Sequence, residues 1–253
     1  MPIYSGVNKM GEVHIGSTAI AKAYVGTTQV FTSAYVFNPI YSTNQTDVHV
    51  RDLAIADGWD AIEPLNATIT VESGVILYST STSVSAFNTG TTFPEGSKIT
   101  LINQGVILGK GGLGGWAFDR NGAAGGGALQ AKHAITIDNA GGRIAGGGGG
   151  GEGAEKYVNP SRSHSAGGGG IGNGGGGGEG GHAGTLTAAG TTSPVDASVA
   201  TSQGGYGGGY GASGNNAIQT DSNPRVPGAG GYAVSGNSFI TWIDVGTRNG
   251  TIS

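Results

Sequence analysis

The sequence contains no cysteine among its 253 residues. Disulfide bridges and thiolate metal sites are therefore excluded as sources of stability. Charged residues are also scarce, at 11% of the chain, and 12 Lys and Arg against 16 Asp and Glu give a net charge of -4. Because the cations are scattered and form no stripe, we expect no nucleic-acid partner.

Long apolar runs and catalytic patterns are missing as well. No stretch approaches the roughly 20 residues that span a bilayer, so we expect no membrane insertion. The first residues, MPIYSGVNKMGEVHIG, lack a basic start followed by an apolar core, so we expect no export signal. No carboxylate pair stands out, and the five histidines show no metal-ligand spacing; these histidines are His14, His49, His133, His164 and His182. We therefore expect no cofactor, no metal and no enzymatic activity.

Glycine is what the chain has in excess, and its distribution is uneven. Only 8 of the 54 glycines fall in residues 1–104, and the other 46 follow. The later glycines form runs within residues 109–115, 122–127, 141–151, 167–184, 204–214 and 228–236. This break predicts a β-rich domain over residues 1–104, a glycine-rich domain over residues 105–236, and a C-terminal strand over residues 237–253 that returns to the first domain.

The first domain is expected to be mainly β, with one short helix. Residues 19–31 read as a hairpin around Gly26-Thr27, and residues 46–59, TDVHVRDLAIADGW, offer a Thr/Asp start and a glycine stop that predict a helix. Short apolar runs separated by Ser, Thr and Gly predict strands in a meandering or solenoid-like sheet; the runs are residues 68–71, 75–78, 99–102 and 106–108.

Three interpretations compete for the glycine-rich half. A flexible linker is the simplest, since glycine-rich chains are usually random coils. Collagen fails because the strict Gly-X-Y repeat is absent. The third is a bundle of extended polyglycine II helices, each with three residues per turn, in which every N–H and C=O pairs with a neighbouring helix. Alternation of pure glycine with segments rich in charged and aromatic residues favours the bundle.

If successive glycine runs are antiparallel, every other connection emerges at the same end. One set is irregular in sequence and reads as functional loops; its members are residues 116–121, 152–166, 185–203 and 215–227. The other set reads as structural and consists of residues 128–140, with a strand-like Ala134–Ile137, then short turns at residues 171–173 and near Tyr210.

The chain resembles the receptor-recognition adhesins at the tip of the long tail fibre of T-even-like bacteriophages. The resemblance rests on IGSTAIAKAYVGTTQVF, on VRDLAIADGW, on the interrupted glycine runs and on the C-terminal NSFITWIDVGTRNGTIS. It implies that one adhesin docks on a trimeric fibre protein, that a polyglycine II sandwich projects from it, and that distal variable loops bind a bacterial outer-membrane protein or surface glycan. It also implies a location at the fibre tip of the virion.

Candidate receptor-binding residues are the large polar and aromatic residues of those loops, since loops on a rigid scaffold carry recognition. They are Trp116, Phe118, Asp119, Arg120, Glu155, Lys156, Tyr157, Arg162, His164, Val195, Asp196, Asn223 and Arg225. Trp116 could equally pack against the base of the glycine bundle. Candidate fibre-attachment residues, which could equally fill the small domain's core, are Ile3, Tyr4, Val30, Phe31, Tyr35, Val36 and Phe37.

Three other functions are weighed against this one. A fibre-assembly chaperone predicts absence from the finished particle. A purely structural polyglycine protein predicts flat, regular faces, which the long irregular segments contradict. Glycan hydrolysis at the tip would need a carboxylate pair among Asp119, Glu152, Glu155 and Asp196.

Overall fold

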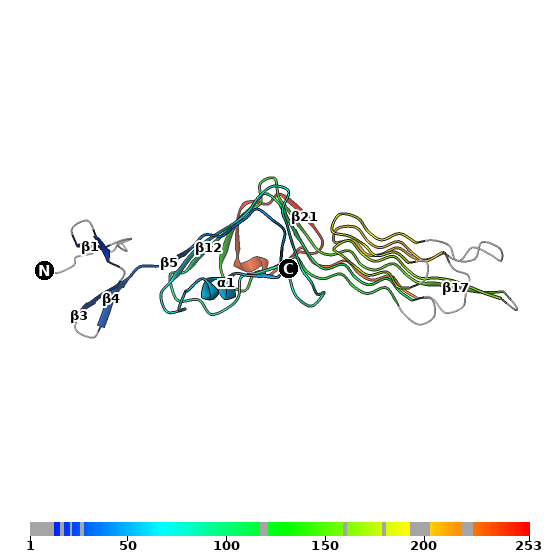
Figure 1. The fold of residues 1–253 in the computed structure, drawn as a ribbon, viewed down its shortest axis with the longest axis horizontal. Coiled ribbons are helices and arrows are strands. Elements are labelled where there is room, and N and C mark those ends of the chain that lie inside the picture. Colours follow the sequence, from blue (N-terminus) through cyan, green and yellow to red (C-terminus); the bar gives the residue numbers. More distant parts are fainter. Residues whose placement is uncertain are drawn as a thin grey trace.

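The structure is a computed structural model, and it describes residues 13–15, 18–20, 22–25, 28–116, 121–158, 161–178, 181–192, 203–218 and 225–253. For residues up to 32, 155–158 and 161–164 within these ranges, only the backbone is described. The molecule is elongated, with the parallel sheets in the middle and the glycine-rich runs extending to one side (Figure 1).

Three parallel sheets form the central part. The first contains β5 (Tyr35–Phe37), β9 (Leu65–Val71), β12 (Lys98–Asn103), β15 (Ile135–Asp138) and β20 (Ile240–Asp244), and β6 (Ile40–Tyr41) also pairs with β9. The second contains β7 (Gln45–Thr46), β10 (Ile76–Tyr78), β13 (Val106–Leu108), β16 (Arg143–Ala145) and β21 (Thr247–Asn249). The third contains β8 (Val48–His49), β11 (Phe87–Asn88), β14 (Leu129–Gln130) and β19 (Val234–Ser235).

The chain visits the three sheets in turn, so successive visits form the coils of a three-sided solenoid. All pairings among these strands are parallel. The four short strands expected from the sequence are present as β9, β10, β12 and β13, and the strand-like Ala134–Ile137 forms β15 between β12 and β20. The interpretation of a mainly β, solenoid-like arrangement is therefore confirmed.

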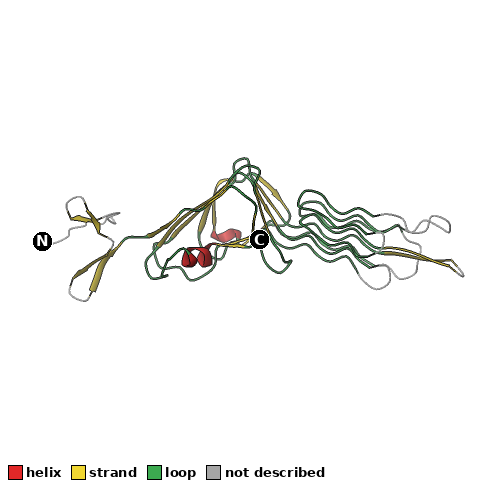
Figure 2. Ribbon diagram, in the orientation of Figure 1, coloured by secondary structure: helices red, strands yellow, loops and turns green. Residues whose placement is uncertain are grey.

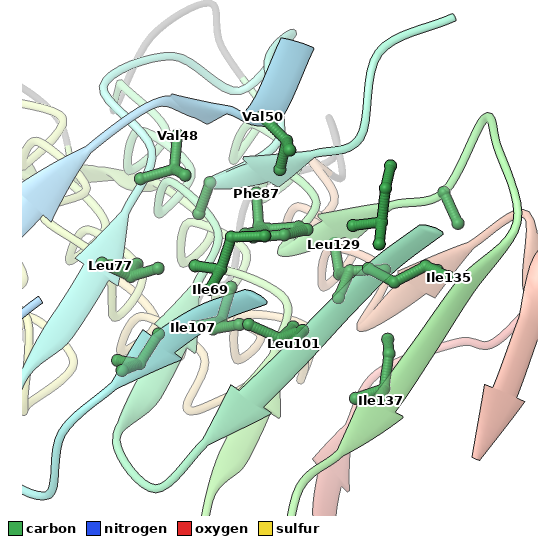
Figure 3. Packing of buried hydrophobic residues seen from close by; sticks show 14 of the residues in the cluster. Val48, Val50, Ile69, Leu77, Phe87, Leu101, Ile107, Leu129, Ile135 and Ile137 are labelled. Carbon is green, nitrogen blue, oxygen red and sulfur yellow. The ribbon is translucent and has the colours of Figure 1, made fainter. Parts of the chain in front are cut away.

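In the core, the inward faces of corresponding strands stack from coil to coil. Alternate residues of β9 are buried, as expected for a strand with one face inward. Parallel register then places Ile69 beside Leu101 and Leu101 beside Ile137, while Phe87 lies beside Leu129 (Figure 3). Each coil thus contributes apolar side chains to the same interior rows, and burial of these rows holds the solenoid together.

The helix is shorter than the sequence predicts. Residues 46–59 were expected to be helical, whereas α1 spans Val50–Ala56 and ends before Gly58, whose φ is +116°. Thr46 belongs instead to β7 and pairs with Tyr78, and β8 pairs with β11. Strand pairing with Tyr78 and with β11, which lie more than thirty positions later in the sequence, thus overrides the local signal for a helix start. A 3-10 turn at Asn237–Phe239 precedes β20.

Two hairpins precede the solenoid. β1 (Val13–Ile15) pairs antiparallel with β2 (Thr18–Ile20), and β3 (Lys22–Val25) pairs antiparallel with β4 (Thr28–Thr32). The strands on either side of Gly26-Thr27 confirm the expected hairpin there. The expected start of this hairpin at Ala19 is wrong, because Ala19 and Ile20 belong to β2 and pair with the preceding strand, β1.

A buried amide stack lies where the first sheet turns into the second. Asn103 and Asn139 are both fully buried, and Asn103 Nδ2 donates to Asn139 Oδ1 over 2.7 Å. Asn139 Nδ2 donates in turn to the carbonyl of Val245 over 2.9 Å. The stack therefore links three successive turns of the solenoid.

Replacing Asn139 by Ala should destabilise the protein by about 2–4 kcal/mol, because it leaves buried partners unsatisfied and creates a cavity. Thermal and chemical unfolding measure this change. Asn66, exposed on β9, is the matched control, and Asn66→Ala should change stability by less than about 0.5 kcal/mol. Equal effects of the two substitutions would contradict a structural role for the stack.

The glycine-rich runs leave and re-enter the solenoid at one corner, between the second and third sheets. Residues 109–128 connect β13 to β14, and residues 146–233 connect β16 to β19. Residues 79–86 make the corresponding short connection one coil earlier. The strands β14, β15 and β16 lie between the two long insertions and pair within the solenoid.

Hydrogen bonds of the glycine-rich passes repeat every third residue. Gly109, Gly112 and Gly115 donate in order to the carbonyls of residues 145, 148 and 151. Gly111 and Gly114 donate to residues 172 and 175, on another neighbouring pass. Exposure follows the same period, since Lys110, Leu113 and Trp116 are the positions of this pass that reach solvent. A threefold extended backbone has this repeat.

The pass formed by residues 146–152 lies at the centre of the others. Its N–H groups donate to residues 123–126, 168–171 and 212–215, and its carbonyls accept from residues 112–115, 205–208 and 228–231. A Cβ on Gly150 would overlap the carbonyl of Leu113, and a Cβ on Gly148 would overlap that of Gly208. Enclosure on every side explains why residues 146–151 are all glycine.

Replacing Gly150 by Ala should destabilise the glycine-rich part by about 3 kcal/mol, because backbone must move to admit the methyl group. Gly209→Ala is the matched control, since a Cβ there would meet nothing within 4 Å. Unfolding, monitored by limited proteolysis, distinguishes the two variants. Equal tolerance of both substitutions would contradict close packing around residues 146–152.

Candidate functional site

The candidate site is the end of the glycine-rich passes farthest from the solenoid, which we call the distal end. Figure 2 shows the hairpin of β17 (Ala154–Val158) and β18 (Ser161–Ser165) extending beyond the other passes there. The distal end also includes Trp116, the hydrogen bond from the N–H of Gly181 to the carbonyl of Gly178, and the passes up to Thr192, Ile218 and Arg225. Several connections therefore meet at one end of a common scaffold.

Hydrogen bonds between passes fix the bases of these connections. The Glu152 side chain is 3% exposed, and its Oε2 accepts from the N–H of Ala217 over 2.9 Å. Asn121 Oδ1 accepts from the N–H of Val226 over 3.0 Å. Thr192 Oγ1 donates to the carbonyl of Gly204 over 2.8 Å. Side chains thus replace glycine contacts where passes end and connections begin.

The connection expected over residues 152–166 is a regular hairpin rather than an irregular loop. Its register pairs Tyr157 with Arg162 and Glu155 with His164, and it places Lys156 opposite Ser163. All five receptor-binding residues predicted in this segment are therefore brought together on two adjacent strands. The sequence signal missed is the alternation of serine with Arg162 and His164 after Asn159-Pro160.

Trp116 is 48% exposed at the distal end of its pass. A Cβ on Gly178 would lie 3.4 Å from the indole ring of Trp116, so the ring packs against Gly178. Trp116 therefore both packs against the glycine scaffold and presents surface to solvent. Sequence reasoning offered these as alternatives, and the structure combines them.

The remaining predicted receptor-binding residues fall into two groups. Arg225 is 8% exposed, which places its side chain among the passes rather than on the surface. The others lie outside the described residues; they are Phe118, Asp119, Arg120, Val195, Asp196 and Asn223. Ile218 and Val226 are 63% and 56% exposed at the same end, and sequence reasoning did not single them out.

One expected loop has different boundaries. Residues 185–203 were expected to lie together at the distal end, but the Thr185 carbonyl accepts from Gly172, at the solenoid side of the passes. Thr185 Oγ1 also accepts from Thr187 and Ala188, which closes a tight turn. The chain then runs outward again through residues 190–192. The run at residues 167–184 correspondingly returns to the distal end, where Gly181 donates to the carbonyl of Gly178.

The described residues among those predicted for fibre attachment lie at the other side of the solenoid. Tyr35, Val36 and Phe37 form β5 at the edge of the first sheet, with Val36 59% exposed and Phe37 in the hydrophobic core. Tyr35 Oη donates to Asp57 Oδ2 over 2.9 Å, and this hydrogen bond, followed by desolvation, raises the pKa of Tyr35. Val30 and Phe31 belong to β4, and Ile3 and Tyr4 lie outside the described residues.

Three tyrosines of the glycine-rich runs cover the flanks of the passes. Tyr232 donates to or accepts from Ser85 Oγ over 2.8 Å, and Arg143 lies over the Tyr210 ring at 4.5 Å. Tyr206 is 45% exposed and its hydroxyl accepts from Gln203 Nε2 over 3.2 Å. Trp242 packs against the solenoid core, where the chain returns to it.

The described residues contain no group of three or more His, Cys, Asp and Glu residues that could hold a metal ion. They also contain no helix long and apolar enough to cross a membrane. A pocket of about 420 Å³ lies beside α1, in the solenoid region and not at the distal end; it is lined by His49, Arg51, Asp52, Asn88, Gly90, Thr91, Thr92 and Lys132.

Comparison with known proteins gives one family and one related structure. Residues 35–253 match the family described as phage tail fibre adhesin Gp38. The fold is similar to a chain in the crystal structure of the gp37–gp38 adhesin tip complex of the bacteriophage S16 long tail fibre. That similarity has a TM-score of 0.61 and 24% sequence identity, and it covers 88% of this chain and 83% of the other. No curated protein sequence matches the chain.

The family match begins at β5 and continues through every coil of the solenoid and both glycine-rich insertions. It therefore includes the solenoid, the glycine scaffold and the distal end. Adhesins bind and do not catalyse, so membership indicates a binding protein, and it places the protein in the tail fibre of a virion. The chain belongs to the Gp38 family of phage tail fibre adhesins, and it is not an enzyme.

Proposed function

We propose that this adhesin sits at the tip of the long tail fibre and binds a bacterial outer-membrane receptor, a protein or a surface glycan, through its distal end. The observation that carries the proposal is the position of the β17–β18 hairpin. Tyr157 and Arg162 are paired at the far end of the molecule, on a scaffold whose interior is almost free of side chains. Large amphipathic side chains on a rigid support bind at low entropic cost.

The glycine-rich passes are proposed to form a polyglycine II sandwich. Three features support this: the three-residue hydrogen-bond repeat, the central pass with six neighbouring segments, and the close approach of backbones where a Cβ would not fit. Such a scaffold has no hydrophobic core that loop changes could disturb. Host range could then vary through the distal connections while the scaffold stays unchanged.

This arrangement suggests a separate role for each of three parts of the chain. Residues 1–104 would attach the adhesin to the trimeric fibre protein, one copy per fibre tip, and residues 105–236 would carry the receptor-binding surface. Residues 237–253 would return the chain to the attachment domain. The pairing of β20 with β15 and of β21 with β16 returns the chain to the solenoid, whose earlier coils lie within residues 1–104. Arg225, being buried, is proposed to support the connections rather than to contact the receptor.

Simultaneous replacement of Tyr157 and Arg162 by Ala should abolish adsorption to host cells while leaving assembly with the fibre protein intact. Loss of one hot-spot residue typically costs about 2 kcal/mol or more of binding, so a double loss should exceed a hundredfold. Adsorption of the fibre-bound adhesin to whole cells measures this.

A double variant on the solenoid, Glu95→Ala with Lys98→Ala, serves as the control because both residues are exposed there. It should adsorb like the wild type. Unchanged adsorption of the Tyr157 and Arg162 variant would remove the hairpin from the proposed receptor contact. Absence of the protein from finished particles would instead favour an assembly chaperone.

A further inference from the structure

The segment before β5 contains a tandem repeat that the family match does not include. Residues 14–20 read HIGSTAI and residues 24–30 read YVGTTQV, ten positions later. Both copies place a glycine and a hydroxyl residue between two β-prone strands, and both form an antiparallel hairpin, β1–β2 and β3–β4. The family match starts at residue 35, directly after them.

Each hairpin forms a sheet by itself. Neither pairs with another described strand, and Figure 1 shows them beyond β5, at the end opposite β17. An isolated two-stranded hairpin is marginally stable in water, and three or more strands are needed for independent stability. Each hairpin therefore lacks the third strand that would stabilise it.

The free edges of these hairpins carry little protection against pairing. Natural proteins guard exposed edges with lysine, other charges or proline. Lys22 is the only Asp, Glu, Lys or Arg residue in the four strands, which also contain no proline.

We propose that the two hairpins attach the chain by β-strand addition, each accepting one exposed strand of the fibre protein. This inference rests on the proposed function, which assigns fibre attachment to the N-terminal part. Repetition of the hairpin identifies the kind of partner, because the same edge presented twice fits a homo-oligomer that offers the same strand more than once. Linked binding of two sites then raises the overall affinity beyond that of either hairpin.

Hairpin geometry identifies the backbone groups that would pair. Where two residues separate the strands, the pair next to the turn exchanges both of its N–H to carbonyl bonds, and the next pair leaves its N–H groups facing outward. The next pairs are His14 with Ala19 and Tyr24 with Gln29. Proline at Ala19 and Gln29 would remove an outward donor without removing a bond of the hairpin itself.

The test uses the full chain, co-expressed with the fibre protein, and measures the affinity of the complex. Ala19→Pro with Gln29→Pro should weaken association at least a hundredfold, and each single substitution should weaken it less. The control, Ala19→Thr with Gln29→Thr, keeps both N–H groups and should bind like the wild type. Thermal unfolding and cell binding of the isolated proline variant should match the wild type, since residues 35–253 are unchanged.

The failures are distinguishable. If the wild-type chain does not associate with the fibre protein at all, the proposed attachment fails and this inference fails with it. If the wild type associates and the double proline variant binds equally well, only strand addition is overturned. Concentration-dependent self-association of the isolated chain that the proline variant abolishes would also overturn it, by showing that the edges pair with a second copy.

Discussion

The structure depends on backbone hydrogen bonds between glycine-rich passes that have no room for side chains. An extended threefold backbone makes no internal hydrogen bonds, so each N–H and C=O must find its partner on a neighbouring pass. The central pass at residues 146–152 does this in six directions. Ordering these residues costs backbone entropy that the hydrogen bonds alone barely offset. The assembly therefore needs many passes at once and needs their ends to be held.

The solenoid supplies that anchorage. Both long insertions leave its second sheet and re-enter its third, so parallel strand pairing fixes where the passes at residues 109–127 and 146–231 begin and end. Rows of buried residues such as Ile69, Leu101 and Ile137 stabilise the coils in the conventional way. Hydrophobic burial thus holds one part, and hydrogen bonding between backbones holds the part that grows from it. Recognition can then be confined to the distal end, where large side chains reappear.

Much of this arrangement was predictable from local pattern, and the errors have identifiable causes. The strands β9, β10, β12 and β13 could be predicted because each is a short apolar run bounded by turn residues. The start of α1 could not, since Thr46 pairs with Tyr78 in a neighbouring coil. The turn at Thr185 was missed because a run of glycine carries no internal signal of where it folds back. The length of this run did carry such a signal, because at about 3.1 Å per residue an unbroken pass over residues 167–184 would be far longer than any neighbouring pass.

The distal end is proposed to bind a receptor on the bacterial surface. The most direct measurement is binding of the adhesin, in complex with its fibre partner, to whole cells and to cells lacking each major outer-membrane protein or surface glycan in turn. We expect strong binding to intact cells that is lost when one such component is removed. Absence of binding to any cell that the phage infects would contradict receptor binding by the distal end.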